Sequence, residues 1–324
     1  MSILVGDIGG TKTRLAVAEV QNERVALDLE RRYSSNEFAS LAEVIERFLD
    51  ETGARCALGG FAVAGPVVDG RSKITNLPWA LDAAALEDQL GFRRARLLND
   101  LEASAWGIAA LDPSDLAELQ PGEPGGRGNA CVVAAGTGLG EAGLYWDGRC
   151  HRAFATEGGH TDFAATDERE FALLNHLRKR FGRVSWERVV SGMGIGNIYL
   201  FLSDWRGATH VPAVAEILEN GGDLAATVAE QAERCPICAE TMTLFALLYG
   251  REAGNMALKH MALGGVYLGG GIAPKNLDLL RRGELIQGFL DKGRMRPLME
   301  RMPVRVILDP LVPLLGAARF LAAG

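Results

Sequence analysis

Residues 3–11 read Ile3-Leu4-Val5-Gly6-Asp7-Ile8-Gly9-Gly10-Thr11, an apolar run that leads through one aspartate into a glycine turn. After the turn, residues 15–20 resume an extended and largely apolar pattern, so the sequence predicts a strand, a tight turn and a second strand. Glycines let backbone N–H groups approach a bound oxyanion, because no Cβ stands in the way. Asp7 is then a candidate for holding a cation beside that anion, through water. The stretch therefore predicts a phosphate and metal site.

Two other interpretations compete for this stretch. An ordinary hairpin turn would also contain a glycine pair, and the turn alone does not exclude it. A P-loop is excluded, because the Gly-Lys-Ser/Thr ending is absent and a strand follows where a P-loop opens a helix.

The same pattern of strand, glycine turn and strand occurs again in the second half of the chain. The apolar run at 130–135 leads into Gly136-Thr137-Gly138, and residues 142–146 resume an extended pattern. A strand, a glycine turn and a second strand thus occur once in each half. This repetition predicts two related sheets that face one another across a nucleotide.

Two glycine-rich segments imitate a dinucleotide-binding fingerprint. Residues 138–143 match G-x-G-x-x-G letter for letter, but residues 144–148 read as a strand that ends in a turn, where the fingerprint requires a helix. Residues 192–196 precede an expected helix at 198–205, but no strand comes before them. The sequence therefore argues against an NAD site.

Composition excludes several classes of protein. The chain has 324 residues, 48% of them hydrophobic, which suits a large core and favours two domains. The net charge is −7 without a dense run of Lys and Arg, so we expect no nucleic-acid partner. No segment approaches the roughly 18 consecutive apolar residues of a membrane helix, and the start lacks the basic region of a signal peptide. Five scattered cysteines fit a reducing cytoplasm.

Strands and helices alternate along the chain, which predicts an α/β protein with a mixed sheet. A loop rich in proline and glycine at 121–128 marks a predicted domain boundary. We expect residues 169–258 to be mostly helical. The other predicted strands lie at 25–30, 57–63, 96–98, 266–268 and 304–308, and the other predicted helices at 41–49, 84–90, 101–111, 276–282 and 314–323.

Asn99 and Asp100 end a predicted strand just before a helix. One interpretation is helix capping, with Asn99 as N-cap and Glu102 at the third helical position. The other is catalytic, because an aspartate at the carboxyl end of a sheet strand can accept a proton from a substrate hydroxyl that attacks phosphorus. The two interpretations are compatible.

Three further segments carry polar chemistry. Glu157-Gly158-Gly159-His160 presents a carboxylate and an imidazole in a loop, which suits a ligand with many hydroxyls or forms a plain surface loop. Glu187 stands at an apparent helix start, where a solvated side chain is the default. Cys235-Pro236-Ile237-Cys238 falls within a helical stretch and lacks the second pair that zinc usually needs, so we interpret both cysteines as packing residues.

Together these segments resemble the bacterial glucokinase family, within the hexokinase and actin-like ATPase superfamily, over essentially the whole chain. Gly6–Thr11 and Ala135–Gly140 resemble its two phosphate motifs, and Gly265–Ile272 resembles its adenosine motif. Leu98–Ala103 is similar to the segment with the catalytic aspartate, and Glu157–His160 and Glu187 are similar to the sugar-binding segments.

The resemblance implies an α/β protein with the two-domain actin-like ATPase (ribonuclease H-like) fold, with a cleft between a smaller N-terminal and a larger C-terminal domain. We expect the small domain over residues 1–110, completed by the C-terminal segment 300–324. The large domain then covers residues 111–299.

The resemblance also implies an activity: transfer of the γ-phosphoryl group of ATP to the 6-hydroxyl of glucose, a step that feeds glycolysis. It makes Asp100 the general base and places Asp7 beside a Mg²⁺ ion that bridges the phosphates. It further implies a homodimer that works in the cytoplasm, with no nucleic-acid or membrane partner. The implied sugar-binding residues are Asn99, Asp100, Glu157, His160 and Glu187, and the implied nucleotide-binding residues are Gly6, Asp7, Ile8, Gly9, Gly10, Thr11, Gly136, Thr137, Gly138, Gly269, Gly270 and Gly271.

Two alternatives stay open from the sequence. The chain could phosphorylate another hexose, such as mannose or an N-acetylhexosamine. It could also be an actin-like nucleotide switch without sugar chemistry, which the Glu157 and His160 loop disfavours.

Overall fold

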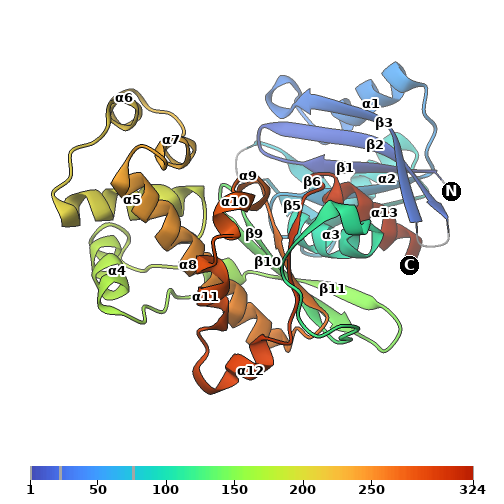
Figure 1. Cartoon of the computed structure of the whole chain (residues 1–324). Coiled ribbons are helices and arrows are strands. Elements are labelled where there is room, and N and C mark those ends of the chain that lie inside the picture. The colour runs from blue at the N-terminus through green and yellow to red at the C-terminus, as the bar shows by residue number, and fades with distance from the viewer. Residues whose placement is uncertain (1, 22–23, 75–76, 324) are drawn as a thin grey trace. The chain divides into compact units, whose positions relative to one another are not determined.

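Figure 1 shows the chain as a computed structural model that describes residues 2–21, 24–74 and 77–323. Contacts between residues divide the chain into two compact units. Unit 1 contains residues 1–115, 143–155 and 309–324, and unit 2 contains residues 116–142 and 156–308. The units group residues that contact one another. The predicted small domain, residues 1–110 with 300–324, and the predicted large domain, residues 111–299, stay predictions.

Unit 1 is built on a five-stranded mixed sheet with the order β3-β2-β1-β4-β7 among the described residues. The hairpin of β1 and β2 and the pair β2 and β3 are antiparallel, whereas β1, β4 and β7 run parallel. Every strand predicted for this part of the chain is confirmed. The bounds are β1 Ser2–Ile8, β2 Lys12–Gln21, β3 Arg24–Ser34, β4 Leu58–Val63 and β7 Arg94–Asn99.

Helices cover both faces of this sheet. Because side chains alternate along a strand, Leu4 and Ile8 pack with α1 (Leu41–Thr52) and α2 (Ala83–Leu90), whereas Ile3 and Val5 pack with α13 (Val312–Ala323). Helix α1 begins at the N-cap Ser40, whose side chain accepts from the N–H of Glu43, and it ends at Gly53 with φ of 67°.

Two glycines let α13 approach α3 (Asp100–Gly107) backbone to backbone. A Cβ on Gly316 would overlap the carbonyl of Ala103, and a Cβ on Gly107 would overlap the carbonyl of Val312. The predicted helix 101–111 is shorter than expected. It ends at Gly107, and a 3₁₀ turn, η2 Ile108–Ala110, follows.

The second sheet has six strands in the order β11-β10-β9-β12-β13-β8 among the described residues. Strand β12 runs parallel to both β9 and β13, and β8 is antiparallel to β13. In each sheet the strand that follows a glycine turn lies beside the strand that precedes it, β2 beside β1 and β10 beside β9. The bounds are β8 Leu116–Gln120, β9 Ala130–Ala135, β10 Leu139–Trp146, β11 His151–Thr156, β12 Gly265–Gly269 and β13 Val304–Ile307, and a short pair, β5 Arg71–Lys73 and β6 Ala80–Asp82, stands apart in unit 1.

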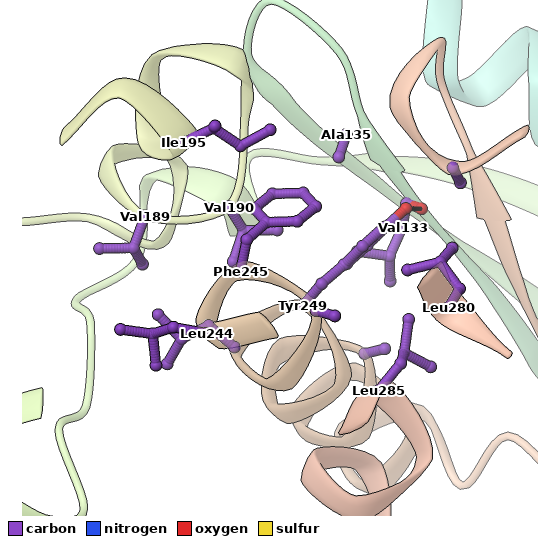
Figure 2. Close-up of a cluster of buried hydrophobic side chains, with 14 of the residues drawn as sticks. Val133, Ala135, Val189, Val190, Ile195, Leu244, Phe245, Tyr249, Leu280 and Leu285 are labelled. Carbon is purple, nitrogen blue, oxygen red and sulfur yellow. Dashed lines mark hydrogen bonds between the residues drawn. The ribbon is translucent and has the colours of Figure 1, made fainter. Parts of the chain in front are cut away.

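Helix α8 (Pro236–His260) is the central helix of unit 2 (Figure 2). Its Phe245 and Tyr249 are fully buried, and the Tyr249 hydroxyl donates to the carbonyl of Val133 at 2.8 Å. This bond fixes α8 on β9. The other helices of the unit are α4 Glu168–Phe181, α5 Gly192–Arg206, α6 Pro212–Asn220, α7 Leu224–Gln231, α9 Ile272–Lys275, α10 Leu277–Leu280, α11 Glu284–Leu290 and α12 Arg296–Met299.

Three expectations for this half were wrong in detail. Helix α5 begins at Gly192, not at residue 198, because Ser191 caps it by accepting from the N–H of Gly194. The helix predicted at 276–282 is the shorter α10, Leu277–Leu280, and a separate short helix, α9, comes before it. Cys235 does not lie within a helix; it is the N-cap of α8, and its Sγ accepts from the N–H of Cys238.

Both of these cysteines are buried, as expected of packing residues. The described helices include none that is both long and apolar enough to cross a membrane.

Candidate functional site

The first glycine turn joins β1 to β2 and is braced from β3. The N–H of Gly9 donates to the carbonyl of Lys12 at 2.9 Å, which closes the turn. Ser35, directly after β3, donates its hydroxyl to the carbonyl of Gly9 at 3.0 Å and its N–H to the carbonyl of Thr11 at 3.0 Å. Ser35 was not predicted from the sequence, because only the pairing of β2 with β3 brings it to the turn.

The residues predicted to bind nucleotide in this segment differ in their surroundings. Gly9, Gly10 and Thr11 lie at the turn and are partly or fully exposed. Ile8 is a core residue of β1, and a Cβ on Gly6 would lie 2.8 Å from Leu15 Cδ2. The structure thus gives Gly6 and Ile8 packing roles in the sheet and leaves the turn itself accessible.

Asp7 lies in β1 directly before the turn, opposite Arg14 of β2. Burial raises the pKa of the Asp7 carboxyl above its ordinary value, and the nearby Arg14 guanidinium opposes that shift. A bound cation would also favour the ionised form. In residues 2–21, 24–74 and 77–323 no group of three or more His, Cys, Asp or Glu side chains could hold a metal ion. Asp7 offers one carboxylate beside the turn, which would suit an Mg²⁺ ion held mainly by phosphates and water.

Asn99 is the N-cap of α3, which confirms the capping interpretation. Its Oδ1 accepts from the N–H of Leu101 at 2.9 Å and of Glu102 at 3.3 Å, and its Nδ2 donates to the carbonyl of Gly65 at 3.2 Å. Gly65 lies just after β4, so the amide also joins two neighbouring strand ends. One Nδ2 hydrogen remains for a ligand.

Asp100 is the first residue of α3 and is half-buried, with Oδ1 accepting from the N–H of Leu101 at 2.9 Å. The register aligns Ile8 of β1 with Val63 of β4, and Val63 with Asn99 of β7. Because the three strands are parallel, Asp7 and Asp100 lie at the same edge of the sheet. Two strand spacings separate them, about 10 Å.

The second glycine turn is held by the start of α5. The N–H of Gly136 donates to the carbonyl of Gly138 at 2.9 Å, and the carbonyl of Gly136 accepts from the N–H of Gly192 at 2.8 Å. Thr137, between the two glycines, is exposed. The turn thus presents a hydroxyl and backbone groups beside the positive end of a 15-residue helix.

The third glycine segment, Gly269-Gly270-Gly271, ends β12 beside that turn. Gly269 pairs with Ala134 of β9, and Gly270 has φ of 76°. A Cβ on Gly270 would overlap the carbonyl of Ala135, so only glycine fits there. The structure therefore brings the second and third predicted nucleotide segments together at the carboxyl ends of parallel strands β9 and β12.

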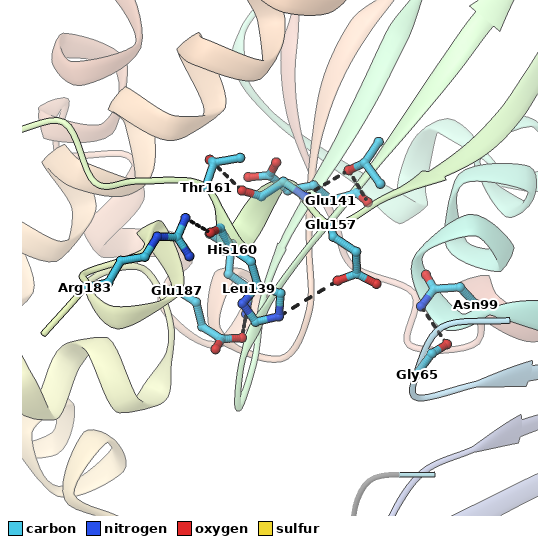
Figure 3. A network of polar contacts seen from close by, with 11 residues as sticks. Gly65, Asn99, Leu139, Glu141, Glu157, His160, Thr161, Arg183 and Glu187 are labelled. Carbon is cyan, nitrogen blue, oxygen red and sulfur yellow. Dashed lines mark hydrogen bonds and ion pairs between the residues drawn. The ribbon is translucent and has the colours of Figure 1, made fainter. Parts of the chain in front are cut away.

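Glu157 and His160 follow β11 in a loop whose two glycines pack on β10 (Figure 3). Their side chains are 65% and 60% exposed, and Glu157 Oε2 lies 3.9 Å from His160 Nε2. A Cβ on Gly158 would overlap the Glu141 carboxyl, and a Cβ on Gly159 would overlap the carbonyl of Leu139. The glycine pair therefore holds the loop close to β10 while both polar side chains stay accessible.

Glu187 lies in a 3₁₀ turn, η5 Trp186–Arg188, and is not a freely solvated side chain. Its Oε2 accepts from the N–H of Leu139 at 3.1 Å, directly after the second glycine turn (Figure 3). A Cβ on Gly138 would overlap the same oxygen. The N–H of Trp186 donates to the carbonyl of Thr161 at 3.0 Å, so this turn also contacts the end of the 157–160 loop.

Arg183 is a second residue that the sequence analysis missed. Its Nη2 donates to the carbonyl of His160 at 2.7 Å, and its Nε donates to Asp162 Oδ1 at 2.6 Å (Figure 3). The guanidinium therefore fixes the main chain of the loop. Arg183 lies in the segment that the sequence predicts to be mostly helical, and a single arginine there gives no local indication of this role.

The chain is similar to known proteins over its whole length. The family model described as Glucokinase matches residues 4–324. The glucokinase of Nostoc punctiforme is 41% identical over 332 residues, which cover 98% of this chain and 97% of that protein.

Solved structures have the same fold. The crystal structure of glucokinase from an Antarctic psychrotroph is 29% identical, with a TM-score of 0.87 over 100% of this chain and 99% of the other. A ROK family glucokinase from Streptomyces griseus, solved in complex with glucose and AMPPNP, has a TM-score of 0.67 at 20% identity and covers 100% of both chains. The latter likeness concerns the fold alone.

The family model and the relatives agree with the resemblance found in the sequence, and the solved structures are sugar kinases with the actin-like ATPase fold. The chain therefore belongs to the glucokinase family and has the fold of these kinases.

Proposed function

We propose that this chain transfers the γ-phosphoryl group of ATP to the 6-hydroxyl of glucose and so supplies glucose 6-phosphate to glycolysis. The observation that carries the proposal is the hydrogen bond between Glu187 Oε2 and the N–H of Leu139. It joins a carboxylate suited to sugar hydroxyls to the end of a turn suited to phosphate. The exposed Glu157 and His160 follow the neighbouring strand of the same sheet.

The sugar-binding groups have complementary hydrogen-bonding abilities. Glu157 and Glu187 accept from hydroxyls, His160 donates or accepts, and Asn99 donates through its remaining Nδ2 hydrogen. A sugar that lacks one matched hydroxyl would leave one of these groups unpaired, which is how such a site rejects analogues.

Asp100 acts as the general base in this proposal. Its carboxylate accepts the proton of the 6-hydroxyl as that oxygen attacks the γ-phosphorus, and the bond from phosphorus to the bridging oxygen breaks to release ADP. The bond from the N–H of Leu101 to Oδ1 fixes the orientation of the Asp100 carboxyl group.

The glycine segments bind the nucleotide. The N–H groups of Gly9 and Gly136 close the two turns, and the other backbone N–H groups of Gly9–Thr11 and Gly136–Gly138 suit the phosphates. Gly271 borders open space, since nothing lies within 4 Å of a Cβ position there. When bound beside Asp7, Mg²⁺ would offset the negative charge of the phosphates.

A coupled assay of ADP release tests this function across glucose, mannose, N-acetylglucosamine and N-acetylmannosamine. We expect the highest kcat/KM with glucose. A higher value with another hexose would make the chain a kinase of that sugar, and ATP hydrolysis that no sugar stimulates would favour a nucleotide switch.

We also propose a homodimer that works in the cytoplasm. The support is the family resemblance, the frequency of twofold dimers among soluble enzymes, and five unpaired cysteines, which suit a reducing compartment. Light scattering on the purified protein measures the oligomeric state: a mass twice that of the 34.7 kDa chain is expected.

A further inference from the structure

Two glutamates of unit 2 are buried against each other. Glu141 on β10 is 1% exposed and Glu252 on α8 is 0% exposed. Three of their four carboxyl oxygens have no hydrogen-bond donor among the described residues, and the fourth, Glu252 Oε2, accepts from Asn255 Nδ2 at 2.8 Å. An unpaired buried carboxylate is costly, so this arrangement needs an explanation.

A shared proton explains it. Ionised carboxylates are acceptors only, so two of them cannot bond to each other and they repel. Burial, and then the neighbouring Glu252 carboxyl, raise the pKa of Glu141 to about 9. Burial also raises the pKa of Glu252, and Asn255, Lys259 and Lys292 oppose that shift. The raised pKa values leave one proton between the two carboxyls at neutral pH, so the O–H of one can donate to the carboxylate of the other.

The other titratable groups around the pair do not take over this role. Burial keeps the Cys131 thiol and the Tyr249 hydroxyl neutral by raising the pKa of each. Arg251 is engaged elsewhere, with Nε 3.1 Å from Glu170 Oε1 and Nη1 3.1 Å from Asp291 Oδ2. Lys259 and Lys292 approach the pair as cations near neutral pH. Burial lowers the pKa of Lys292 to about 8, so Lys292 also loses its proton in the alkaline range.

Glu141 contacts the sugar-binding loop with both its main chain and its side chain. Thr156 Oγ1 donates to the main-chain carbonyl of Glu141 at 3.0 Å and accepts from the N–H of Gly158 at 3.3 Å. Gly158 lies so close to the Glu141 carboxyl that a Cβ would overlap Oε2. The Glu141 carboxyl group therefore packs directly against the loop between Glu157 and His160.

We propose that Glu141 and Glu252 share one proton and that this singly protonated pair holds the loop from Thr156 to His160 in the shape that binds the sugar. Glu141 is then a positioning residue for Glu157 and His160. The inference rests on the proposed function in one respect, namely that these two side chains bind glucose. Loss of the proton would set two carboxylates against each other beneath Gly158 and displace the loop.

Glucose KM measured against pH tests the positioning role. In the wild type, removal of the proton should raise glucose KM about fourfold between pH 7.5 and pH 9.5, the factor expected for a group of pKa about 9 that must stay protonated. Glu141→Gln keeps the shape and donates an N–H to Glu252, so its glucose KM should lie within about twofold of wild type at pH 7.5 and stay flat to pH 9.5. Glu252→Gln should also be flat, because the amide introduced at that position then donates to an ionised Glu141.

Glu240→Gln is the matched control on α8, because Glu240 pairs with Arg206 away from this loop. It should keep the alkaline rise of the wild type. The positioning role is overturned if Glu141→Gln shows the same rise as wild type, or if its glucose KM at pH 7.5 rises more than about fivefold.

A second measurement is independent of activity. In protein labelled with ¹³C at the glutamate carboxyl carbons, one carboxyl should show the chemical shift of a protonated acid at pH 7.5, and Glu141→Gln should remove that signal. Absence of a protonated glutamate at pH 7.5 overturns the shared proton. A wild type that carries this signal yet phosphorylates no hexose would instead count against the proposed function.

Discussion

Glu187 and Leu139 are joined by one hydrogen bond, in which Glu187 Oε2 accepts from the main-chain N–H of Leu139 at 3.1 Å. Leu139 is the first residue of β10 and follows the second glycine turn. The carboxylate therefore stabilises the turn predicted to bind phosphate while its second oxygen remains for a sugar hydroxyl. In the proposed function, sugar binding and nucleotide binding therefore depend on the same side chain.

Glu187→Gln should weaken both substrates. The substitution replaces a charged acceptor by a neutral one, which costs about 1 kcal/mol at the Leu139 N–H, so the KM values for glucose and for ATP should each rise about fivefold. Steady-state kinetics with each substrate varied in turn measures this. Glu216→Gln, on the exposed side of α6, should change neither value. A change in glucose KM alone would contradict the coupling.

Gly159→Ala should disturb the sugar loop. The added methyl group overlaps the carbonyl of Leu139, so we expect the free energy of unfolding to fall by about 2 kcal/mol and glucose KM to rise more than ATP KM. Denaturant unfolding and kinetics measure the two effects. Gly53→Ala is the comparison: φ is 67° with nothing within 4 Å, so it should cost about 1 kcal/mol of backbone strain and leave KM unchanged.

Gly316→Ala tests the packing of α13 on α3. The new methyl group would overlap the carbonyl of Ala103, so α3 must shift, and Asp100 at its start shifts with it. We expect a loss of about 3 kcal/mol in the free energy of unfolding and a fall in kcat of about tenfold at nearly unchanged glucose KM. A destabilised variant with full kcat would show that α3 does not depend on this contact.

Asp7→Asn should raise the Mg²⁺ requirement. Removing the Asp7 carboxylate weakens the binding of Mg²⁺. The Mg²⁺ concentration that gives half-maximal rate should therefore rise about tenfold at fixed ATP. EDTA should abolish the activity of wild type, and added Mg²⁺ should restore it. An unchanged Mg²⁺ requirement in Asp7→Asn would remove Asp7 from the metal site.

Local patterns in the sequence predicted most of the fold. Apolar runs and glycine turns gave β1, β2, β9 and β10, since strand burial and turn chemistry are properties of neighbouring residues. The capping role of Asn99 was predicted for the same reason, from Asn99 and Glu102 alone.

Contacts between distant residues account for what the sequence missed. The predicted start of helix α5, residue 198, lies six residues after its actual start, because glycines generally disfavour a helix. In the structure, Gly194 lies so close to the backbone of Val189 that a Cβ would overlap it, and this contact requires glycine. Ser35 and Arg183 brace their loops across more than twenty residues of sequence. Glu141 was not predicted, because its segment was interpreted only as a possible dinucleotide fingerprint. Its burial against Glu252, 111 positions later, has no signal in the neighbouring sequence.

The turnover number of Asp100→Asn with glucose and ATP tests the central claim most directly, with Asp88→Asn on the exposed side of α2 as the matched control. Loss of the base should lower kcat by roughly 10²–10⁴-fold while glucose affinity, measured by equilibrium binding, stays within a few-fold of wild type. Near-normal turnover in Asp100→Asn would contradict the account, because the proton of the 6-hydroxyl would then leave by another route.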